Sequence, residues 1–227
     1  MNELSEELSQ VLRDNGAVLI GFGDVSDLVD DELNIGVAIG LPMPKDMVRS
    51  IEKDPTEEYR KWYHYANGVL NESINAGADF LRKQGYAVRE QTTDKVQRSC
   101  DEYTALPHKS IAIRAGLGWI GKSCLLVTPE YGGALRLSSL VTNAPLSCAE
   151  PILKSRCGTC NVCRDICPYD AIKGVTWEQG KSRDEMFDFE KCRSGTAERC
   201  LDVIGVRMTI CGKCFVFCPY TRKYISK

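Results

Sequence analysis

The sequence predicts a mixed α+β domain followed by a small cysteine-rich domain, and three observations support this. Helical and strand-like segments alternate without a fixed repeat through the first 148 residues, so the chain is not an all-α bundle. Nine of the twelve cysteines follow residue 150, where the segments become short. A length of 227 residues suits one large domain or two small ones, and we predict domains at 1–148 and 149–227.

Hydrophobic periodicity predicts the elements in chain order. Amphipathic spacing indicates a helix over residues 2–14, which Gly16 ends. Pro55 begins a long predicted helix that runs to Arg82 and stops before Gly85. The remaining expected elements are a helix at 109–115 and strands at 17–22, 35–41, 86–90, 125–128 and 135–142.

Composition argues against export and membrane insertion. No run of 18 apolar residues is present and the N-terminal segment is acidic, so we expect a cytoplasmic protein with no membrane partner. In a reducing compartment, so many cysteines favour metal ligation over disulfides. The first 148 residues carry 15 Lys and Arg against 21 Asp and Glu, and the remainder carries 14 against 10. This basic remainder is weak evidence for nucleic-acid binding, because anionic metal clusters would offset its charge.

Two cysteine runs carry the strongest chemical signal. The first is C-x2-C-x2-C-x3-C-P, the bacterial ferredoxin pattern for [4Fe–4S] clusters. Its members are Cys157, Cys160, Cys163, Cys167 and Pro168. The second run lacks one member and consists of Cys211, Cys214, Cys218 and Pro219. Two clusters need eight ligands, and the eighth is Cys192 or Cys200, of which we favour Cys192.

In such runs the fourth cysteine binds the other cluster, which predicts two ligand sets that we call set A and set B. Set A is Cys157, Cys160, Cys163 and Cys218. Set B is Cys167, Cys192, Cys211 and Cys214. A pair of zinc knuckles is the less favoured alternative, since zinc takes four ligands and does not need this run. The isolated Cys100, Cys124 and Cys148 are expected to be small buried hydrophobic residues.

A glycine-rich segment at 116–123, Gly-Leu-Gly-Trp-Ile-Gly-Lys-Ser, matches two nucleotide-binding patterns. It fits the dinucleotide fingerprint G-x-G-x-x-G and the P-loop G-x-x-x-x-G-K-S. Both patterns require a strand before the loop and a helix after it, whereas a predicted helix precedes this loop and a predicted strand follows it. An ATP-driven electron donor is therefore a minor alternative, with Lys122 as its test residue.

The glycine segment, the Leu-Leu-Val-Thr-Pro that ends at Pro129 and the two cysteine runs together resemble the epoxyqueuosine reductase family. That family consists of cobalamin-dependent enzymes with two [4Fe–4S] clusters, distantly similar to the core of reductive dehalogenases. The resemblance implies an α/β nitroreductase-like, cobalamin-binding domain at 1–148 and a ferredoxin-like double [4Fe–4S] domain at 149–227. It also implies an iron–sulfur reductase that passes low-potential electrons from the clusters to a base-off cobalamin for substrate reduction.

The resemblance also indicates site residues. The segment expected to approach the cobalamin consists of Gly116, Gly118, Trp119, Gly121, Lys122 and Ser123. The family places an acidic proton donor shortly before a proline upstream of this segment, but the position three before Pro107 is Thr104. The nearest acids are Asp101, Glu102, Tyr103 and His108. We expect His108 to be the catalytic residue, because an ordinary pKa of about 6.5 suits proton donation, with Tyr103 and Glu102 as further candidates.

The implied partners are an external low-potential electron donor, such as a ferredoxin or a flavodoxin, and a small-molecule or protein-bound substrate. Full-length family members carry a C-terminal helical-repeat domain that helps to hold tRNA. This chain ends nine residues after its last cysteine, so tRNA is a disfavoured substrate. The alternative function is a ferredoxin-type electron-transfer protein that reactivates the corrinoid of a partner protein.

Overall fold

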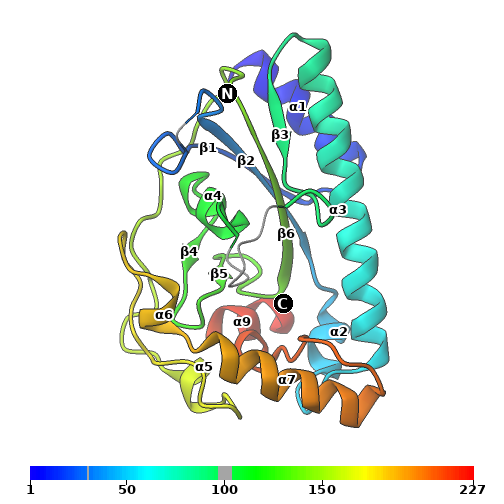
Figure 1. Cartoon of the computed structure of the whole chain (residues 1–227), viewed down its shortest axis with the longest axis vertical. Coiled ribbons are helices and arrows are strands. Elements are labelled where there is room, and N and C mark those ends of the chain that lie inside the picture. The colour runs from blue at the N-terminus through cyan, green and yellow to red at the C-terminus, as the bar shows by residue number, and fades with distance from the viewer. Residues whose placement is uncertain (30, 97–103) are drawn as a thin grey trace. The chain divides into compact units, whose positions relative to one another are not determined.

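The computed structural model describes residues 1–29, 31–96 and 104–227 (Figure 1). By their contacts the residues form two compact units, each assembled from three segments. Unit 1 comprises 1–42, 65–117 and 136–152, and unit 2 comprises 43–64, 118–135 and 153–227. The domain boundary at residue 148 stays a prediction, and it lies shortly before the last passage from unit 1 to unit 2.

Unit 1 is built on a four-stranded sheet with the strand order β1-β2-β6-β3. β1 (Leu19–Asp24) pairs antiparallel with β2 (Ile35–Pro42), and β3 (Val88–Glu90) pairs antiparallel with β6 (Leu135–Thr142). The last strand in sequence therefore lies inside the sheet, between β2 and β3. Strands from the first segment of the unit (β1 and β2) and from its last segment (β6) therefore belong to one hydrogen-bonded sheet.

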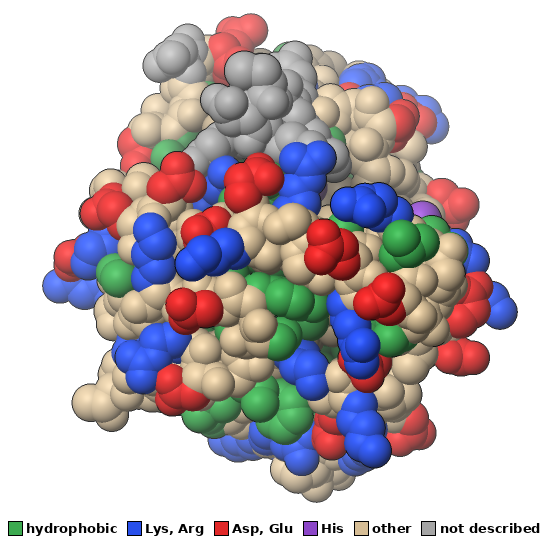
Figure 2. Space-filling model, turned by 60° about the horizontal axis from the view of Figure 1, so that its bottom comes forward, with side chains coloured by type: hydrophobic (Ala, Val, Ile, Leu, Met, Phe, Trp, Pro, Cys, Tyr) green, Lys and Arg blue, Asp and Glu red, His purple; other side chains and the backbone are tan. Residues whose placement is uncertain are grey.

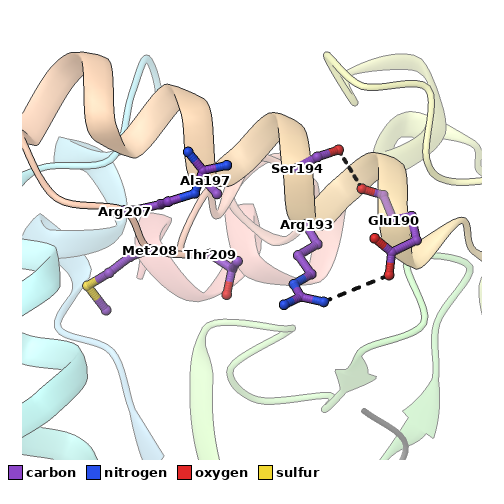
Figure 3. A pocket seen from close by; sticks show the side chains of 7 residues that line it. All are labelled: Glu190, Arg193, Ser194, Ala197, Arg207, Met208 and Thr209. Carbon is purple, nitrogen blue, oxygen red and sulfur yellow. Dashed lines mark hydrogen bonds and ion pairs between the residues drawn. The ribbon is translucent and has the colours of Figure 1, made fainter. Parts of the chain in front are cut away.

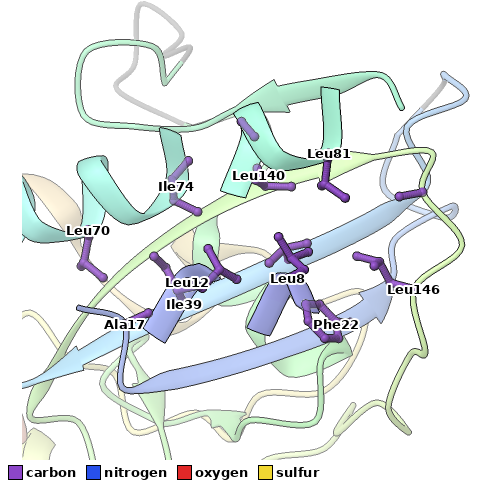
Figure 4. Packing of buried hydrophobic residues seen from close by; sticks show 13 residues of the cluster. Leu8, Leu12, Ala17, Phe22, Ile39, Leu70, Ile74, Leu81, Leu140 and Leu146 are labelled. Carbon is purple, nitrogen blue, oxygen red and sulfur yellow. The ribbon is translucent and has the colours of Figure 1, made fainter. Parts of the chain in front are cut away.

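One face of this sheet packs against α1 (Glu3–Asp14) and against the part of α3 (Glu57–Lys83) that belongs to unit 1 (Figure 4). Leu8 and Leu12 of α1 share a core with Leu70 and Ile74 of α3, and all four are essentially inaccessible to water. Burial of each such side chain contributes about 2 kcal/mol. These helices therefore hold one face of the sheet through a continuous apolar layer.

Gly23 of β1 and Gly36 of β2 face α4 (His108–Arg114). Side chains alternate between the two faces of a strand, so the apolar residues next to these glycines point to the opposite face. A Cβ atom at Gly23 would lie 2.4 Å from the carbonyl carbon of Arg114, and one at Gly36 would lie 2.5 Å from the side chain of Ile111. Both distances are shorter than any real contact of that kind. The glycines thus allow α4 to approach the sheet closely, which fixes the position of the residues at both of its ends.

Unit 2 contains a two-stranded hairpin of β4 (Trp119–Ile120) and β5 (Leu126–Val127) together with short helices. The helices are α2 (Lys45–Ser50), α5 (Val162–Asp165), α6 (Arg183–Met186), α7 (Phe189–Ile204), α8 (Lys213–Val216) and α9 (Pro219–Ser226). α2 contacts α9, and α5 contacts α8. The turn after β5 packs against α9, where the Thr221 hydroxyl accepts a hydrogen bond from the Gly133 amide at 3.0 Å.

The α+β prediction is confirmed, and the predicted elements are present with small shifts at their ends. The periodicity did not predict β4, and its presence changes the partner of β5. β5 pairs with β4, whereas β6 enters the four-stranded sheet. The reason is that residues 119–120, which we expected in a glycine turn, form a strand and give β5 its partner. In the part of the chain that the structure describes, no helix is long and apolar enough to cross a membrane.

Candidate metal centre

All eight cysteines of sets A and B belong to unit 2: three lie inside α5, α7 and α8, and the other five lie in loops. The first run surrounds α5, with Cys163 inside that helix. The second run surrounds α8, and its last member, Cys218, precedes α9 as the N-cap residue. Pro219 occupies the first turn of α9, where a missing N–H and a fixed φ are tolerated. The Cys-Pro pair therefore ends one ligand loop and begins a helix.

The thiol of Cys163 lies among the other members of set A. Burial raises the pKa of this thiol to about 11, and the charges of Cys157, Cys218 and Cys160 act in the same direction. Charges shift a pKa most strongly within a few ångströms. Cys218 from the second run is therefore near the cysteines of the first run.

The members of set B also lie near one another. Burial raises the pKa of Cys192, and the charges of Cys167 and Cys211 raise it further. Burial also raises the pKa of Cys214 well above its ordinary value, together with the charges of Cys211 and Cys192. Cys163 and Cys167 act on Cys214 as well, so the two sets are neighbours within unit 2. Cys167 of the first run accordingly lies beside cysteines of the second.

These donors fit two [4Fe–4S] clusters. Each cluster takes four cysteine thiolates, and each thiolate binds a different iron, so the sulfurs lie farther apart than the ligands of one ion. Among the described residues, no three His, Cys, Asp or Glu side chains converge on a site for a single metal ion. Burial and neighbouring cysteines disfavour free thiolates here, and bound iron would stabilise the thiolate form that ligation requires.

Cys192 and Cys200 lie on the same face of α7, four residues to either side of Thr196. The Cys192 sulfur lies 3.9 Å from the Thr196 hydroxyl oxygen and faces other cysteines. Cys200 is fully buried, with its sulfur 3.9 Å from the carbonyl oxygen of Ile210. Burial raises the pKa of Cys200, but the groups that act on it are the backbones of Ile210 and Met208. This geometry supports Cys192 as the eighth ligand.

The isolated cysteines differ from one another. Cys124 is buried, as expected, in the turn of the β4–β5 hairpin. Cys148 is exposed, so the expectation of a buried residue is wrong there. Cys148 lies in the loop after β6, where its thiol donates to the Leu146 carbonyl oxygen at 3.7 Å. Cys100 lies outside the described residues.

The glycine-rich segment has the helix–loop–strand order that we expected from the sequence. α4 precedes it and β4 lies inside it, and residues 121–124 form the turn to β5. The Gly121 amide donates to the Leu125 carbonyl at 2.8 Å, and the Cys124 amide donates to the Gly121 carbonyl at 2.9 Å. A Cβ at Gly118 would lie 2.3 Å from the carbonyl oxygen of Val127. The glycines therefore serve the hairpin itself, and the strand–loop–helix context of a P-loop or dinucleotide fingerprint is not met.

Three side chains of this segment, Trp119, Lys122 and Ser123, are buried within unit 2. Trp119 is 1% exposed, its ring lies edge-to-face on Tyr220 at 4.8 Å, and the Arg156 guanidinium lies 5.6 Å from the ring centre. The Trp119 indole N–H has no partner among the described residues. A buried donor of this kind is available to a group bound beside it.

Lys122 is 5% exposed, and its ammonium donates to the side-chain oxygen of Asn161 at 3.0 Å. Asn161 lies between Cys160 and Cys163, so this cation lies against the loop of set A. Within the segment, Gly116 belongs to unit 1 and has a φ of 67°, whereas Gly118 and Gly121 belong to unit 2. The role of the segment in cofactor binding stays a prediction.

His108 is the first residue of α4 in unit 1, and buried polar groups hold its ring. Its Nδ1 lies 2.7 Å from the hydroxyl oxygen of Ser139, which accepts a hydrogen bond from the Gln91 side-chain amide at 3.0 Å. Ser139 is fully buried and Gln91 nearly so. Sequence reasoning missed both, because only the antiparallel pairing of β3 with β6 brings position 91 beside position 139. Glu102 and Tyr103 lie outside the described residues.

Two pockets of unit 2 flank α7. The first has a volume of about 440 Å³, and Figure 3 shows it along the helix face that carries Arg193. It is lined by Glu190, Arg193, Ser194, Ala197, Arg207, Met208 and Thr209. The second has a volume of about 490 Å³, and its lining includes Tyr169 and the set B ligand Cys211. Solvent therefore reaches the edge of set B through the second pocket.

No family model matches the chain. It is 32% identical over 141 residues to the epoxyqueuosine reductase of Bacillus anthracis, which covers 62% of this chain and 36% of that protein. The corresponding values for the enzyme of Synechococcus sp. (strain CC9605) are 33% over 147 residues, 65% and 46%. The epoxyqueuosine reductase of Bacillus subtilis (strain 168) is 28% identical over 191 residues and covers 82% of this chain and 47% of its own length. The chain is thus similar in sequence to part of the epoxyqueuosine reductases.

This relationship confirms the resemblance that the sequence motifs indicate, although the chain spans less than half the length of these curated relatives. Solved structures show the same fold. An epoxyqueuosine reductase matches with a TM-score of 0.66 at 22% identity, over 97% of this chain and 66% of that chain. A catabolic reductive dehalogenase matches with a TM-score of 0.70 at 18% identity, over 97% of this chain and 33% of that chain.

Proposed function

We propose that this chain is an iron–sulfur, corrinoid-dependent reductase of the epoxyqueuosine reductase type. Sets A and B each hold one [4Fe–4S] cluster in a ferredoxin-like domain, and a nitroreductase-like α/β domain contributes to a site for base-off cobalamin. The observation that carries the proposal is the grouping of cysteines from both runs in unit 2, where Cys218 acts on Cys163 and Cys167 acts on Cys192. When bound, the cobalamin supplies a metal that accepts single electrons and reduces the substrate.

Residues of the chain itself bind the cofactor and supply the proton. The glycine-rich segment at 116–123 approaches the cobalamin, with Trp119 and Lys122 fixed in place by Tyr220 and Asn161. His108 supplies a proton to the substrate, and the hydrogen bond to Ser139 orients its ring. A histidine suits this role, because its charge changes near neutral pH. The external electron donor that this scheme requires is a low-potential ferredoxin or flavodoxin.

The substrate is the open part of the proposal, and a modified tRNA is the first to test. One solved epoxyqueuosine reductase, with a TM-score of 0.65 to this chain, was crystallised with an epoxyqueuosine-modified tRNA stem loop. The face of the molecule in Figure 2 carries Lys and Arg interspersed with Asp and Glu rather than one continuous basic patch. Net charge on that face would therefore contribute little to RNA binding. A small-molecule or protein-bound substrate is the alternative.

The test is anaerobic reconstitution of the full chain with iron and sulfide, followed by titration with cob(II)alamin. We expect about eight irons per chain and an electron paramagnetic resonance spectrum that changes to the base-off form on binding. The chain without clusters is the control for adventitious corrinoid. Eight irons with no corrinoid affinity would instead support the electron-transfer protein, and a chain that assembles no clusters would contradict both functions.

A further inference from the structure

Tyr169 follows the Cys-Pro pair of the first run and lies beside set B. Burial raises the pKa of the Tyr169 phenol to about 12, the charge of Cys211 raises it further, and the Thr196 hydroxyl also acts on it, so these two side chains are its polar neighbours. Tyr169 and Cys211 also line the same pocket of about 490 Å³. A phenol keeps its proton at neutral pH, so towards a thiolate ligand it acts as a hydrogen-bond donor.

The position of the Tyr169 ring is set by α7. A Cβ at Gly195 would lie 2.3 Å from a carbon of the ring, so the ring occupies the space that any other residue at 195 would fill. This contact presses the ring against the helix that carries Cys192. Packing therefore holds the ring beside the helix that carries the set B ligand Cys192.

Thr196 connects Tyr169 to a second ligand of set B. It is 1% exposed, and its hydroxyl oxygen lies 3.9 Å from the sulfur of Cys192. The Thr196 hydroxyl thus lies near the sulfur of one set B ligand, and Tyr169 lines a pocket with another, Cys211. In set A, the groups that act on Cys163 and Cys218 are backbone amides and other cysteines.

We propose that Tyr169 is a tuning residue that donates a hydrogen bond to the Cys211 ligand and raises the reduction potential of the set B cluster, with Thr196 holding it in place. This inference rests on the proposed function, because it requires a cluster at set B. A reduced cluster carries one more negative charge than an oxidised one, and a hydrogen bond to a ligand sulfur stabilises that charge. The hydroxyl therefore favours reduction of one cluster over the other.

The test is a redox titration of the reconstituted full chain, monitored by electron paramagnetic resonance, with Tyr169→Phe compared to the wild type. Phenylalanine fills the same space and removes only the hydroxyl. The set B signal is assigned by its loss in Cys192→Ala. We expect the set B potential to fall and the set A potential to stay constant. Tyr131→Phe is the matched control, since Tyr131 is another partly buried tyrosine of unit 2, in ring contact with Tyr224, and its removal should shift neither potential.

A second pair of variants covers the case in which Tyr169→Phe loses a cluster. Thr196→Val should lower the set B potential, whereas Thr196→Ser keeps a hydroxyl and should preserve it. Potentials that stay unchanged in both Tyr169→Phe and Thr196→Val would overturn the inference while leaving the proposed function intact. A wild-type chain that assembles fewer than two clusters would overturn the proposed function and the inference together.

Discussion

Sets A and B use the same ligands and similar sequence motifs, yet unit 2 surrounds them differently. Beside set A lies a buried cation, the Lys122 ammonium, which donates to Asn161 in the ligand loop. Beside set B lie two neutral hydroxyls, those of Tyr169 and Thr196, and a partly exposed cation, Lys213, which lines the same pocket as Cys211. Identical ligands cannot by themselves give two clusters different potentials. A difference must come from their surroundings: neighbouring charges and hydroxyls, backbone amides and exposure to solvent.

The two kinds of neighbour act over different ranges. A buried charge acts on a cluster through space, and low local polarity strengthens that effect. A hydroxyl acts only on the sulfur it touches, and its effect depends on a fixed ring position. Set A should therefore tolerate small movements of its surroundings, whereas set B should respond to changes in packing around Tyr169.

The largest expected effect tests the assignment on which the comparison depends. Cys192→Ala removes a set B ligand, so we expect loss of about half of the iron and of one of the two resonance signals. Cys200→Ala should keep all of the iron, because the Cys200 sulfur faces the Ile210 carbonyl and not set B. It should cost only about 1 kcal/mol of stability as a small core truncation. Chemical iron analysis of both variants shows which cysteine is the eighth ligand. The opposite pattern of iron loss would replace Cys192 by Cys200 in set B.

A smaller effect is expected when the cation beside set A is removed. Lys122→Met replaces a buried ammonium with an apolar side chain of similar length, so the reduced set A cluster loses a stabilising charge. We expect the set A potential to fall and the set B potential to stay constant in a redox titration. Lys223→Met is the control, since Lys223 is exposed on α9 and water and salt screen its charge. If Lys122→Met instead abolished binding of ATP, the minor P-loop alternative would regain support.

The sequence predicted more of the fold than of the surroundings of the site. The long helix ending before Gly85 and the strands of unit 1 follow from periodicity and turn residues, which are local signals, whereas the strand pairings do not. The ligand cysteines are likewise visible from their spacing. Ser139 and Gln91 beside His108, and Thr196 beside Tyr169, are ordinary polar residues that only long-range pairing brings to the site. No local signal could distinguish them from exposed residues of the same types.

The smallest expected effects concern two glycines, one near set A and one near set B. Gly158, in the loop of set A, has a φ of 54° and open space around its Cβ position. Gly158→Ala should therefore cost about 1 kcal/mol through backbone strain alone and leave both potentials unchanged. Chemical denaturation of the reconstituted chain measures this cost.

Gly195, on the side of set B, has helical backbone, but an added Cβ meets the Tyr169 ring at 2.3 Å. Gly195→Ala should cost about 1–3 kcal/mol through overpacking, and it should also lower the set B potential because the ring must move away from Cys211. A Gly195→Ala chain with the wild-type set B potential would show that the hydroxyl does not depend on the ring position. The two sets would then differ in the chemistry of their neighbours but not in their sensitivity to packing.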